Sequence, residues 1–143
     1  MRTRKNRKPF NQIIKIVKKN QIPPVVNATK LFCRFKMDGC GHCVNSQADW
    51  DKMCKTVAGA VNPECVIAEI ETKLLPFFKM RDGFKPNGFP THAVFVNGRH
   101  VQNAEDRSFD GLMQTLRKHR FTNDNAQRRP SRRPFARRRS FRR

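Results

Sequence analysis

Long apolar runs are missing from this sequence of 143 residues. A helix needs about 20 consecutive apolar residues to cross a bilayer, and no stretch comes near that length. The one apolar run near the N-terminus, Ile13 to Val17, is short and is interrupted by Lys15, so it does not fit a secretory signal. We therefore expect a soluble protein without a membrane span that is not secreted through a signal peptide.

Acidic residues are scarce as well: 11 of them stand against 31 lysines and arginines, which gives a net charge of +20. Residues 1–20 hold eight basic residues and no acid, and residues 117–143 hold twelve basic residues with Asp124 as the sole acid. Residues 21–116 are close to neutral, with eleven basic and ten acidic residues. The excess charge thus belongs to two basic arms around one domain of ordinary size.

A complete set of paired cysteines or of metal ligands is also absent. Five cysteines are an odd number, which argues against the fully paired framework of a secreted protein. Cys40 and Cys43 form the CxxC motif of the stretch DGCGHC, and no second CxxC or HxxxH completes a structural zinc site. Val44 stands where haem attachment needs a histidine. A redox pair is the favoured interpretation, while a metal site completed by Cys54 and Cys65, or inert thiols, stay open.

Apolar periodicity places the CxxC motif at the start of a helix. Residues that recur at threes and fours predict three helices, over about Phe10–Val17, Cys40–Val57 and Phe109–Leu116. Compact or alternating apolar runs predict five strands, at Val25–Val26, Leu31–Phe35, Cys65–Ile70, His92–Val96 and Arg99–Gln102. The order of these elements, a βαβ half followed by ββα, predicts a single α/β layer structure.

The connections between these elements also carry signals. Pro23 and Pro24 are expected to stop the first helix. A short helix or irregular segment is expected over Leu74 to Met80, then a loop over residues 83–90. The pair Asn97-Gly98 predicts a type I′ turn between the last two strands, because both residue types tolerate positive φ. Ser108 or Asp106 can cap the closing helix.

The position of the CxxC motif gives both cysteines a chemical role. Cys40 lies where a strand meets a helix start, and the free N–H groups there lower the pKa of a thiol. Cys43, one turn later, is close enough to attack a mixed disulfide formed at Cys40. His42 can add positive charge that stabilises the reduced thiolate, which makes the disulfide a better oxidant. The remaining cysteines lie in apolar patterns and are expected to be small buried hydrophobic residues: Cys33, Cys54 and Cys65.

Two motifs together resemble a known family. CGHC, followed about fifty residues later by GFPTHAVFVNG, is similar to the thioredoxin superfamily and specifically to the catalytic domains of protein disulfide isomerase. The resemblance covers roughly Lys30 to His119. It implies a thioredoxin-like fold, a central mixed sheet flanked by helices, over residues 21–120. Residues 1–20 would then form a basic arm with a short amphipathic helix, and residues 121–143 an arginine-rich tail.

The resemblance also implies roles for particular residues. Cys40 would be the nucleophile and Cys43 the resolving cysteine of a protein dithiol–disulfide oxidoreductase, which needs no metal or other cofactor. The Phe89–Pro90 bond would be cis and would face the disulfide. The backbone at Phe89, Pro90 and Thr91 would pair with an extended substrate peptide, so protein thiols and disulfides are the implied partners. Read without the resemblance, Pro90 would be only a turn residue.

Several positions depart from the family pattern. Gly39 replaces the usual tryptophan before the first cysteine, Val44 a lysine, and Ala48 a proline. The buried acid that helps deprotonate the resolving cysteine would fall at Arg34, and its loss should slow resolution. The family's glycine after the hairpin is absent, although Arg107 matches an arginine there.

The basic arms suit an anionic partner. Arginines pair with phosphates, and the interleaved phenylalanines can stack or fill apolar pockets. The candidate polyanion-binding residues are Arg128, Arg129, Arg132, Arg133, Arg137, Arg138, Arg139, Arg142 and Arg143. Nucleic acid and an acidic protein surface are both open as partners, as are a membrane surface and a merely solvated tail.

The family also suggests where such a protein works. Thioredoxin-like oxidoreductases without signal peptides are encoded by large DNA viruses, which assemble disulfide-bonded particles in the cytosol. We therefore expect an oxidoreductase held among neighbouring subunits of a virion or a cytosolic assembly. The alternative is a non-catalytic minor capsid protein or ribonucleoprotein subunit in which the arms do most of the binding.

Overall fold

A computed structural model describes residues 12–123 of the chain. The nine tail arginines between Arg128 and Arg143 lie outside these described residues, as does most of the N-terminal arm.

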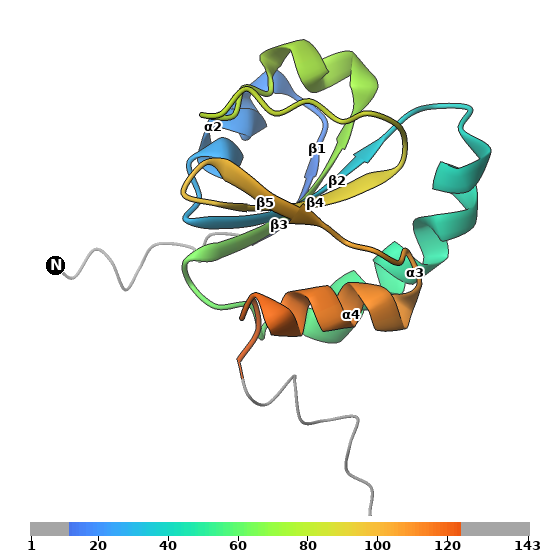
Figure 1. Ribbon diagram of the computed structural model, residues 1–143, viewed down its shortest axis with the longest axis vertical. Helices are drawn as coiled ribbons and strands as arrows, with labels where there is room; N and C mark the ends of the chain where they lie inside the picture. Colours follow the sequence, from blue (N-terminus) through green and yellow to red (C-terminus); the bar gives the residue numbers. More distant parts are fainter. Residues whose placement is uncertain (1–11, 124–143) are drawn as a thin grey trace, which may run out of the picture.

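The described residues form a mixed sheet of five strands in the order β1-β3-β2-β4-β5 (Figure 1). The strands are β1 (Ile13–Ile16), β2 (Lys30–Lys36), β3 (Cys65–Glu71), β4 (Thr91–Val96) and β5 (Arg99–Asn103). The first three run parallel, since β3 pairs with both β1 and β2. β4 runs antiparallel to β2, and β5 antiparallel to β4. The expected α/β fold with a central mixed sheet is confirmed.

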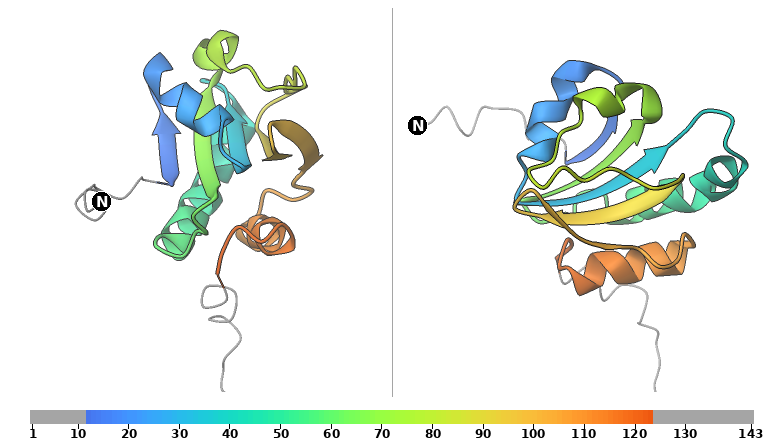
Figure 2. Two further views of the ribbon diagram at one scale, coloured as in Figure 1. Left: turned by 90° about the vertical axis from the view of Figure 1, so that its left-hand side faces the viewer. Right: turned by 45° about the horizontal axis from the view of Figure 1, so that its top comes forward.

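Helices cover both faces of the sheet (Figure 2). One face packs against α3 (Gly41–Val57) and α4 (Phe109–Lys118), and the other against the short helix α2 (Ile22–Val26) and the 3-10 helix η2 (Thr72–Phe77). A second 3-10 helix, η1 (Lys19–Gln21), leads into α2. Side chains alternate along β2, so Phe32 contributes to the core beneath α3 and α4 while Phe35 contributes to the opposite core.

Most of the predicted elements are present with small shifts of their ends. Asn97 and Gly98 both have positive φ, of 53° and 83°, as the predicted type I′ turn requires. Ser108 caps α4, because its hydroxyl accepts a hydrogen bond from the N–H of Gly111 at 3.1 Å. The loop before β4 carries the Phe89–Pro90 peptide bond in the cis form, as the resemblance implies.

Two predicted elements near the N-terminus are wrong. The helix over Phe10–Val17 is replaced by β1, because a strand here pairs with the free edge of β3 and buries Ile16. The strand at Val25–Val26 is replaced by α2. Pro23 and Pro24 occupy the first turn of that helix, where proline costs no hydrogen bond, so they open a helix rather than end one.

The packed domain reaches beyond residues 21–120 at both ends. At one end β1 is part of the sheet. At the other end Phe121 is 0% exposed, its ring centroid lies 6.2 Å from that of Phe32, and Thr122 forms a β-bridge with Val61.

We expect Gly111→Ala to destabilise the protein by about 1–3 kcal/mol, the usual cost of overpacking. An added Cβ would lie 2.5 Å from the Cβ and 2.8 Å from the carbonyl oxygen of Asp106. Gly41→Ala is the matched control, since it also lies in the first turn of a helix but its Cβ would meet nothing within 4 Å. Urea unfolding of both variants checks this expectation, which fails if the two substitutions change the free energy of unfolding equally.

Candidate active site

The CxxC motif lies at the edge of the sheet where β2 ends. A turn at Gly39, with φ of 76°, reverses the chain after β2 and leads into α3. Cys40 is the N-cap of α3, and its sulfur accepts a hydrogen bond from the backbone N–H of Cys43 at 3.2 Å. The thiol therefore takes the place that a serine or aspartate side chain fills at many helix starts.

The surroundings of Cys40 favour its thiolate. Its pKa is lowered, first by the hydrogen bond from the Cys43 side chain, and then by the backbone N–H groups of Cys43 and His42. The positive charge of Arg107, the arginine that matches the family pattern, acts in the same direction. The His42 imidazole itself is exposed, so the predicted role of its side chain in tuning the redox potential stays a prediction.

Cys43 has the opposite character. Its residue is 4% exposed, and its pKa is raised, first by burial and then by the hydrogen bond that it donates to Cys40. When one of the two thiols ionises, the negative charge is favoured on Cys40, because the two pKa values shift in opposite directions. This asymmetry fits an attacking Cys40 and a resolving Cys43.

The structure brings the second motif against the first, although the two are about fifty residues apart. The Cys40 sulfur lies 3.5 Å from the carbonyl oxygen of Phe89, directly before the buried Pro90. Thr91 begins β4 and donates a hydrogen bond from its hydroxyl to the carbonyl of Gly88 at 2.7 Å. All three residues predicted to bind substrate thus lie at the same edge of the sheet as the cysteines.

A buried charged cluster lies below Cys43, and sequence reasoning missed most of it. Arg34 is 0% exposed and faces α3 from β2. Its guanidinium has five N–H donors, and each has a partner: Glu69 Oε2 at 3.1 Å, Ser46 Oγ at 2.9 Å, His92 Nε2 at 3.2 Å, the Cys43 carbonyl at 2.8 Å and Gln47 Oε1 at 3.2 Å. We call this set the Arg34 cluster.

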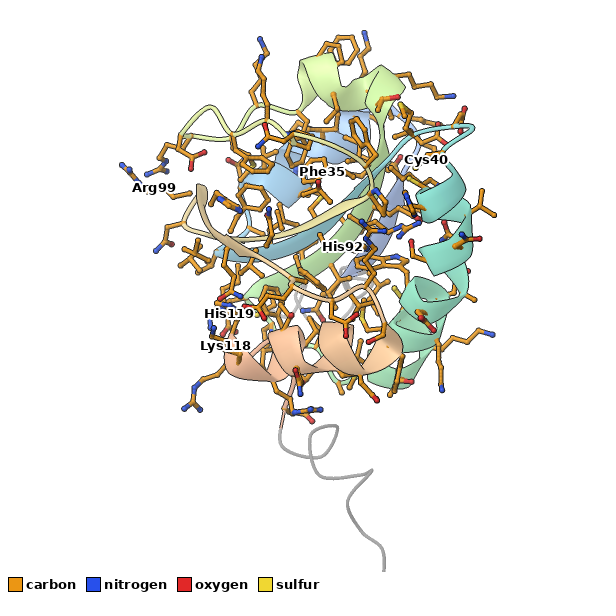
Figure 3. The ribbon with its side chains drawn as sticks, turned by 45° about the vertical axis from the view of Figure 1, so that its right-hand side comes forward. Phe35, Cys40, His92, Arg99, Lys118 and His119 are labelled. Carbon is orange, nitrogen blue, oxygen red and sulfur yellow. The ribbon has the colours of Figure 1, made fainter. Side chains whose placement is uncertain are left out.

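Strand register builds the Arg34 cluster. Arg34 on β2 lies directly beside Glu69 on β3 and His92 on β4, so the three side chains form one row across the sheet. Figure 3 shows His92 in the middle of the sheet, with Cys40 at the start of α3. Burial, followed by the charge of Arg34, lowers the pKa of His92 to about 3, so its Nε2 lone pair is free to accept from Arg34. Trp50 closes the cluster from below, with its ring centroid 5.6 Å from that of His92.

A sequence signal for this cluster did exist. Arg34, Glu69 and His92 each place a polar side chain at a buried-face position of an otherwise apolar strand. A single buried polar residue in an apolar strand can be satisfied by its immediate neighbours. Three of them in neighbouring strands indicate that their side chains interact with one another. The register that aligns them is a property of the sheet and could not be taken from the sequence.

The other three cysteines have raised pKa values and are therefore weak nucleophiles. Cys33 and Cys65 are fully buried, and burial raises the pKa of Cys65 to about 11. Cys54 is half-buried on α3, where burial and then the charge of Glu69 raise its pKa to about 12. Within residues 12–123, no three His, Cys, Asp or Glu side chains gather as a metal-binding group. Over the same residues, no helix combines the length and the apolar character needed to cross a bilayer.

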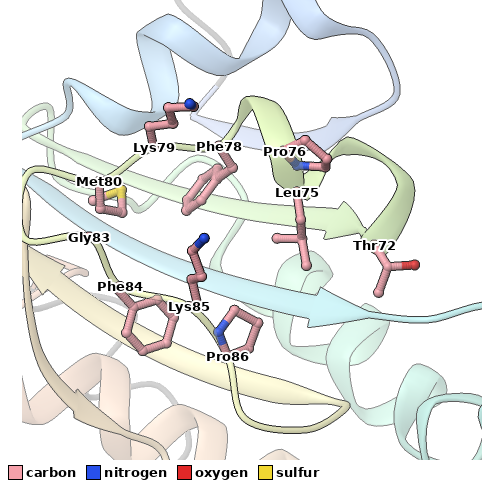
Figure 4. A pocket seen from close by; sticks show the side chains of 10 residues that line it. All are labelled: Thr72, Leu75, Pro76, Phe78, Lys79, Met80, Gly83, Phe84, Lys85 and Pro86. Carbon is pink, nitrogen blue, oxygen red and sulfur yellow. The ribbon is translucent and has the colours of Figure 1, made fainter.

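A cavity of about 700 Å³ opens beside η2 and the loop before β4 (Figure 4). Leu75, Pro76, Phe78 and Phe84 give it an apolar lining, and Lys79 and Lys85 also line it. β2 and β3 are parallel, so η2 and the CxxC motif follow strand ends at the same edge of the sheet. Sequence reasoning missed this cavity, since its lining residues lie in segments expected to be irregular.

Comparison with known proteins identifies the fold. No protein-family model matches the sequence, and no curated protein matches it either. The J-Trx1 fragment of ERdj5 is similar in structure, with a TM-score of 0.59 and 24% identity, over 76% of this chain and 50% of that one. The first thioredoxin domain of mouse protein disulfide-isomerase A4 gives a TM-score of 0.56 and 20% identity, over 73% of this chain and 72% of that one.

A single-domain thioredoxin is similar as well. The oxidised thioredoxin of Plasmodium falciparum gives a TM-score of 0.54 and 15% identity, over 75% of this chain and 97% of that one. The chain therefore has the thioredoxin fold and resembles the thioredoxin domains of protein disulfide isomerases. It spans half the length of the ERdj5 fragment.

We expect Cys43→Ala to raise the pKa of Cys40, because the hydrogen bond from the Cys43 side chain is the largest cause of its lowering. The thiolate fraction of Cys40 would then fall at any pH below its pKa. Iodoacetamide labelling of the Cys40 peptide, followed by mass spectrometry across a pH series, measures the midpoint. Cys54→Ala, which removes a half-buried thiol elsewhere on α3, should leave the midpoint unchanged. An unchanged midpoint in Cys43→Ala would contradict the expectation.

Proposed function

We propose that this protein is a thiol–disulfide oxidoreductase that acts on protein thiols and disulfides. The observation that carries the proposal is the pairing of an accessible, thiolate-favouring Cys40 with a buried, protonated Cys43 at the start of α3. In one direction the Cys40 thiolate attacks a substrate disulfide and releases a substrate thiolate. Cys43 then loses its proton and attacks Cys40, which releases the second substrate thiol and leaves a Cys40–Cys43 disulfide.

The geometry beside Cys40 supports a peptide substrate. The Phe89 carbonyl lies 3.5 Å from the Cys40 sulfur, so a backbone that pairs with Phe89 and Thr91 would bring its own cysteine to Cys40. The apolar cavity adjoins η2, which starts at the same edge of the sheet, and we propose that it takes an apolar side chain of an extended substrate.

Trapping of mixed disulfides tests the oxidoreductase proposal. In cells that normally make the protein, Cys43→Ala should accumulate discrete adducts on non-reducing gels, since Cys40 can still attack but no resolving thiol is present. Mass spectrometry of the adducts would name the substrates. The matched control is the double variant Cys40→Ala, Cys43→Ala, in which the adducts should vanish. A folded Cys43→Ala protein without any adduct would sink the proposal and favour the alternative below.

The alternative is a non-catalytic component of a virion or a ribonucleoprotein, built on the same fold. Arg34 at the place of the family's buried acid favours it, because the group that accepts the proton of the resolving cysteine is missing there. The intact dithiol and its opposed pKa shifts favour the enzyme.

We further propose that the basic arms hold the protein to a polyanion in such an assembly. The net charge of +20 and its concentration in the arms support this, with nucleic acid as the favoured partner. Each phosphate contact contributes roughly −0.9 to the slope of log K against log salt.

Replacement of the nine tail arginines by glutamine should weaken binding to a duplex DNA probe and flatten its salt slope by about 0.9 per lost phosphate contact. Fluorescence anisotropy at several salt concentrations measures both quantities. Lys52→Gln with Lys55→Gln, on the exposed side of α3, is the charge-removal control and should change the slope little. An unchanged slope in the tail variant would remove the tail from the binding site. Polyglutamate as the better competitor would point to an acidic protein surface instead.

A further inference from the structure

The Arg34 cluster puts a positive charge where a related site would hold a proton acceptor. Arg34 is fully buried, and its guanidinium donates to the backbone carbonyl of Cys43 at 2.8 Å. A second donor reaches Ser46, whose hydroxyl in turn donates to the carbonyl of His42 at 2.9 Å. The Arg34 side chain therefore contacts the start of α3, where both active-site cysteines lie, directly at Cys43 and through Ser46 at His42.

The two bases of the cluster are turned toward Arg34. From β3, Oε2 of Glu69 accepts from Arg34 at 3.1 Å and from Gln47 at 3.1 Å, with the Lys36 amine 3.6 Å away. From β4, the Nε2 lone pair of His92 accepts from Arg34 at 3.2 Å. A His92 with a pKa near 3 does not take up a proton at neutral pH. Neither base is poised to receive the Cys43 proton.

We propose that Arg34 is a positioning residue that stabilises the Cys43 thiolate by its charge, in place of proton transfer to a buried acid. The proposal rests on the function proposed above and gives it a direction. Burial raises the pKa of Cys43, and the charge of Arg34 offsets part of that rise. Cys43 is therefore a better leaving group than burial alone would allow, which favours oxidation of substrate dithiols. The preferred substrates of the site are then reduced protein cysteines rather than protein disulfides.

The reaction balances without a base in the cluster. A substrate thiolate attacks the Cys40 sulfur of the Cys40–Cys43 disulfide, a new S–S bond forms, and the old one breaks. The electron pair leaves on the Cys43 sulfur beside Arg34, and solvent then protonates it. A second substrate thiolate attacks the mixed disulfide and releases the Cys40 thiolate. Two substrate thiols are oxidised to one disulfide, and an external disulfide such as oxidised glutathione reoxidises the enzyme in the same way.

Glu69 determines how strongly the positive charge of Arg34 stabilises the Cys43 thiolate. It pairs with Arg34 at 3.1 Å and is itself buried, so it offsets the guanidinium charge without removing it. Arg34 is the nearer of the two to Cys43, because it contacts the Cys43 backbone directly. The charge of Arg34 contributes to the pKa of Cys43 and lowers it. Removal of the Glu69 charge alone should therefore make Cys43 a better leaving group. Removal of both charges should make it a poorer one.

The test measures how fast glutathione reduces the preformed Cys40–Cys43 disulfide, under conditions where thiolate attack limits the rate. Arg34→Met combined with Glu69→Gln, which leaves no unpaired buried charge, should react about tenfold more slowly. Glu69→Gln alone should react severalfold faster, and Arg34→Lys, which keeps the charge, should stay within about threefold of the original protein. The alkylation rate of Cys40 should change little in the double variant, because the groups that lower the pKa of Cys40 are Cys43, His42 and Arg107.

The signs of these changes decide the proposal. A role of Arg34 in packing alone would slow Arg34→Lys and the double variant alike and would leave Glu69→Gln no faster, and that pattern overturns the proposal. If the double variant does not fold by circular dichroism, Glu69→Gln decides: a faster reaction supports the proposal, and an unchanged or slower one overturns it. The glutathione assay uses no protein substrate. A negative result in it therefore contradicts the role of Arg34 without contradicting the oxidoreductase function, which trapping by Cys43→Ala tests separately. If the original protein forms no Cys40–Cys43 disulfide at all, both proposals fail.

Discussion

The buried pairing of Arg34 with Glu69 across β2 and β3 is the interaction on which the site depends. A charge without a partner is costly in this core, since an isolated buried ion is penalised by several kcal/mol. Glu69 offsets the charge of the buried Arg34, and three of the remaining donors of Arg34 hold the start of α3 through the Cys43 carbonyl, Ser46 and Gln47. The geometry of Cys40 and Cys43 follows from that turn.

The sheet edge does the rest of the positioning. Parallel strands end at one edge, so the turn after β2 and the helix after β3 lie there together, and β4 starts there because it runs the other way. This arrangement brings Phe89 to the Cys40 sulfur. It also gives the two cysteines different surroundings, with Cys40 at an exposed helix start and Cys43 over the core. Their opposed pKa shifts follow from the hydrogen bond between the two thiols and from the burial of Cys43.

The sequence predicted the elements that carry strong local signals. The apolar runs of β2, β3 and β4, the periodicity of α3 and α4, and the Asn97-Gly98 turn all depend on neighbours in the chain. Prediction failed for β1 and α2, which have weak patterns. β1 is a strand because β3 offers it a parallel edge, and that edge exists only once the sheet has formed. Pro23 and Pro24 predict the end of a helix, although proline is equally tolerated in the first turn of one, which is where they lie in α2.

By itself the sequence determined the dithiol, its place at a helix start, the second motif and the concentration of positive charge in the arms. These features are set by residue identity and short-range order. Only the tertiary structure decided what surrounds the dithiol: the carbonyl of Phe89, the cavity by η2 and the buried row Glu69–Arg34–His92. From the sequence, Arg34 is only a basic residue at the position where the family has a buried acid. Strand register made it a paired charge beneath Cys43, because cross-strand neighbours 35 and 58 residues away in the chain are joined by the sheet alone.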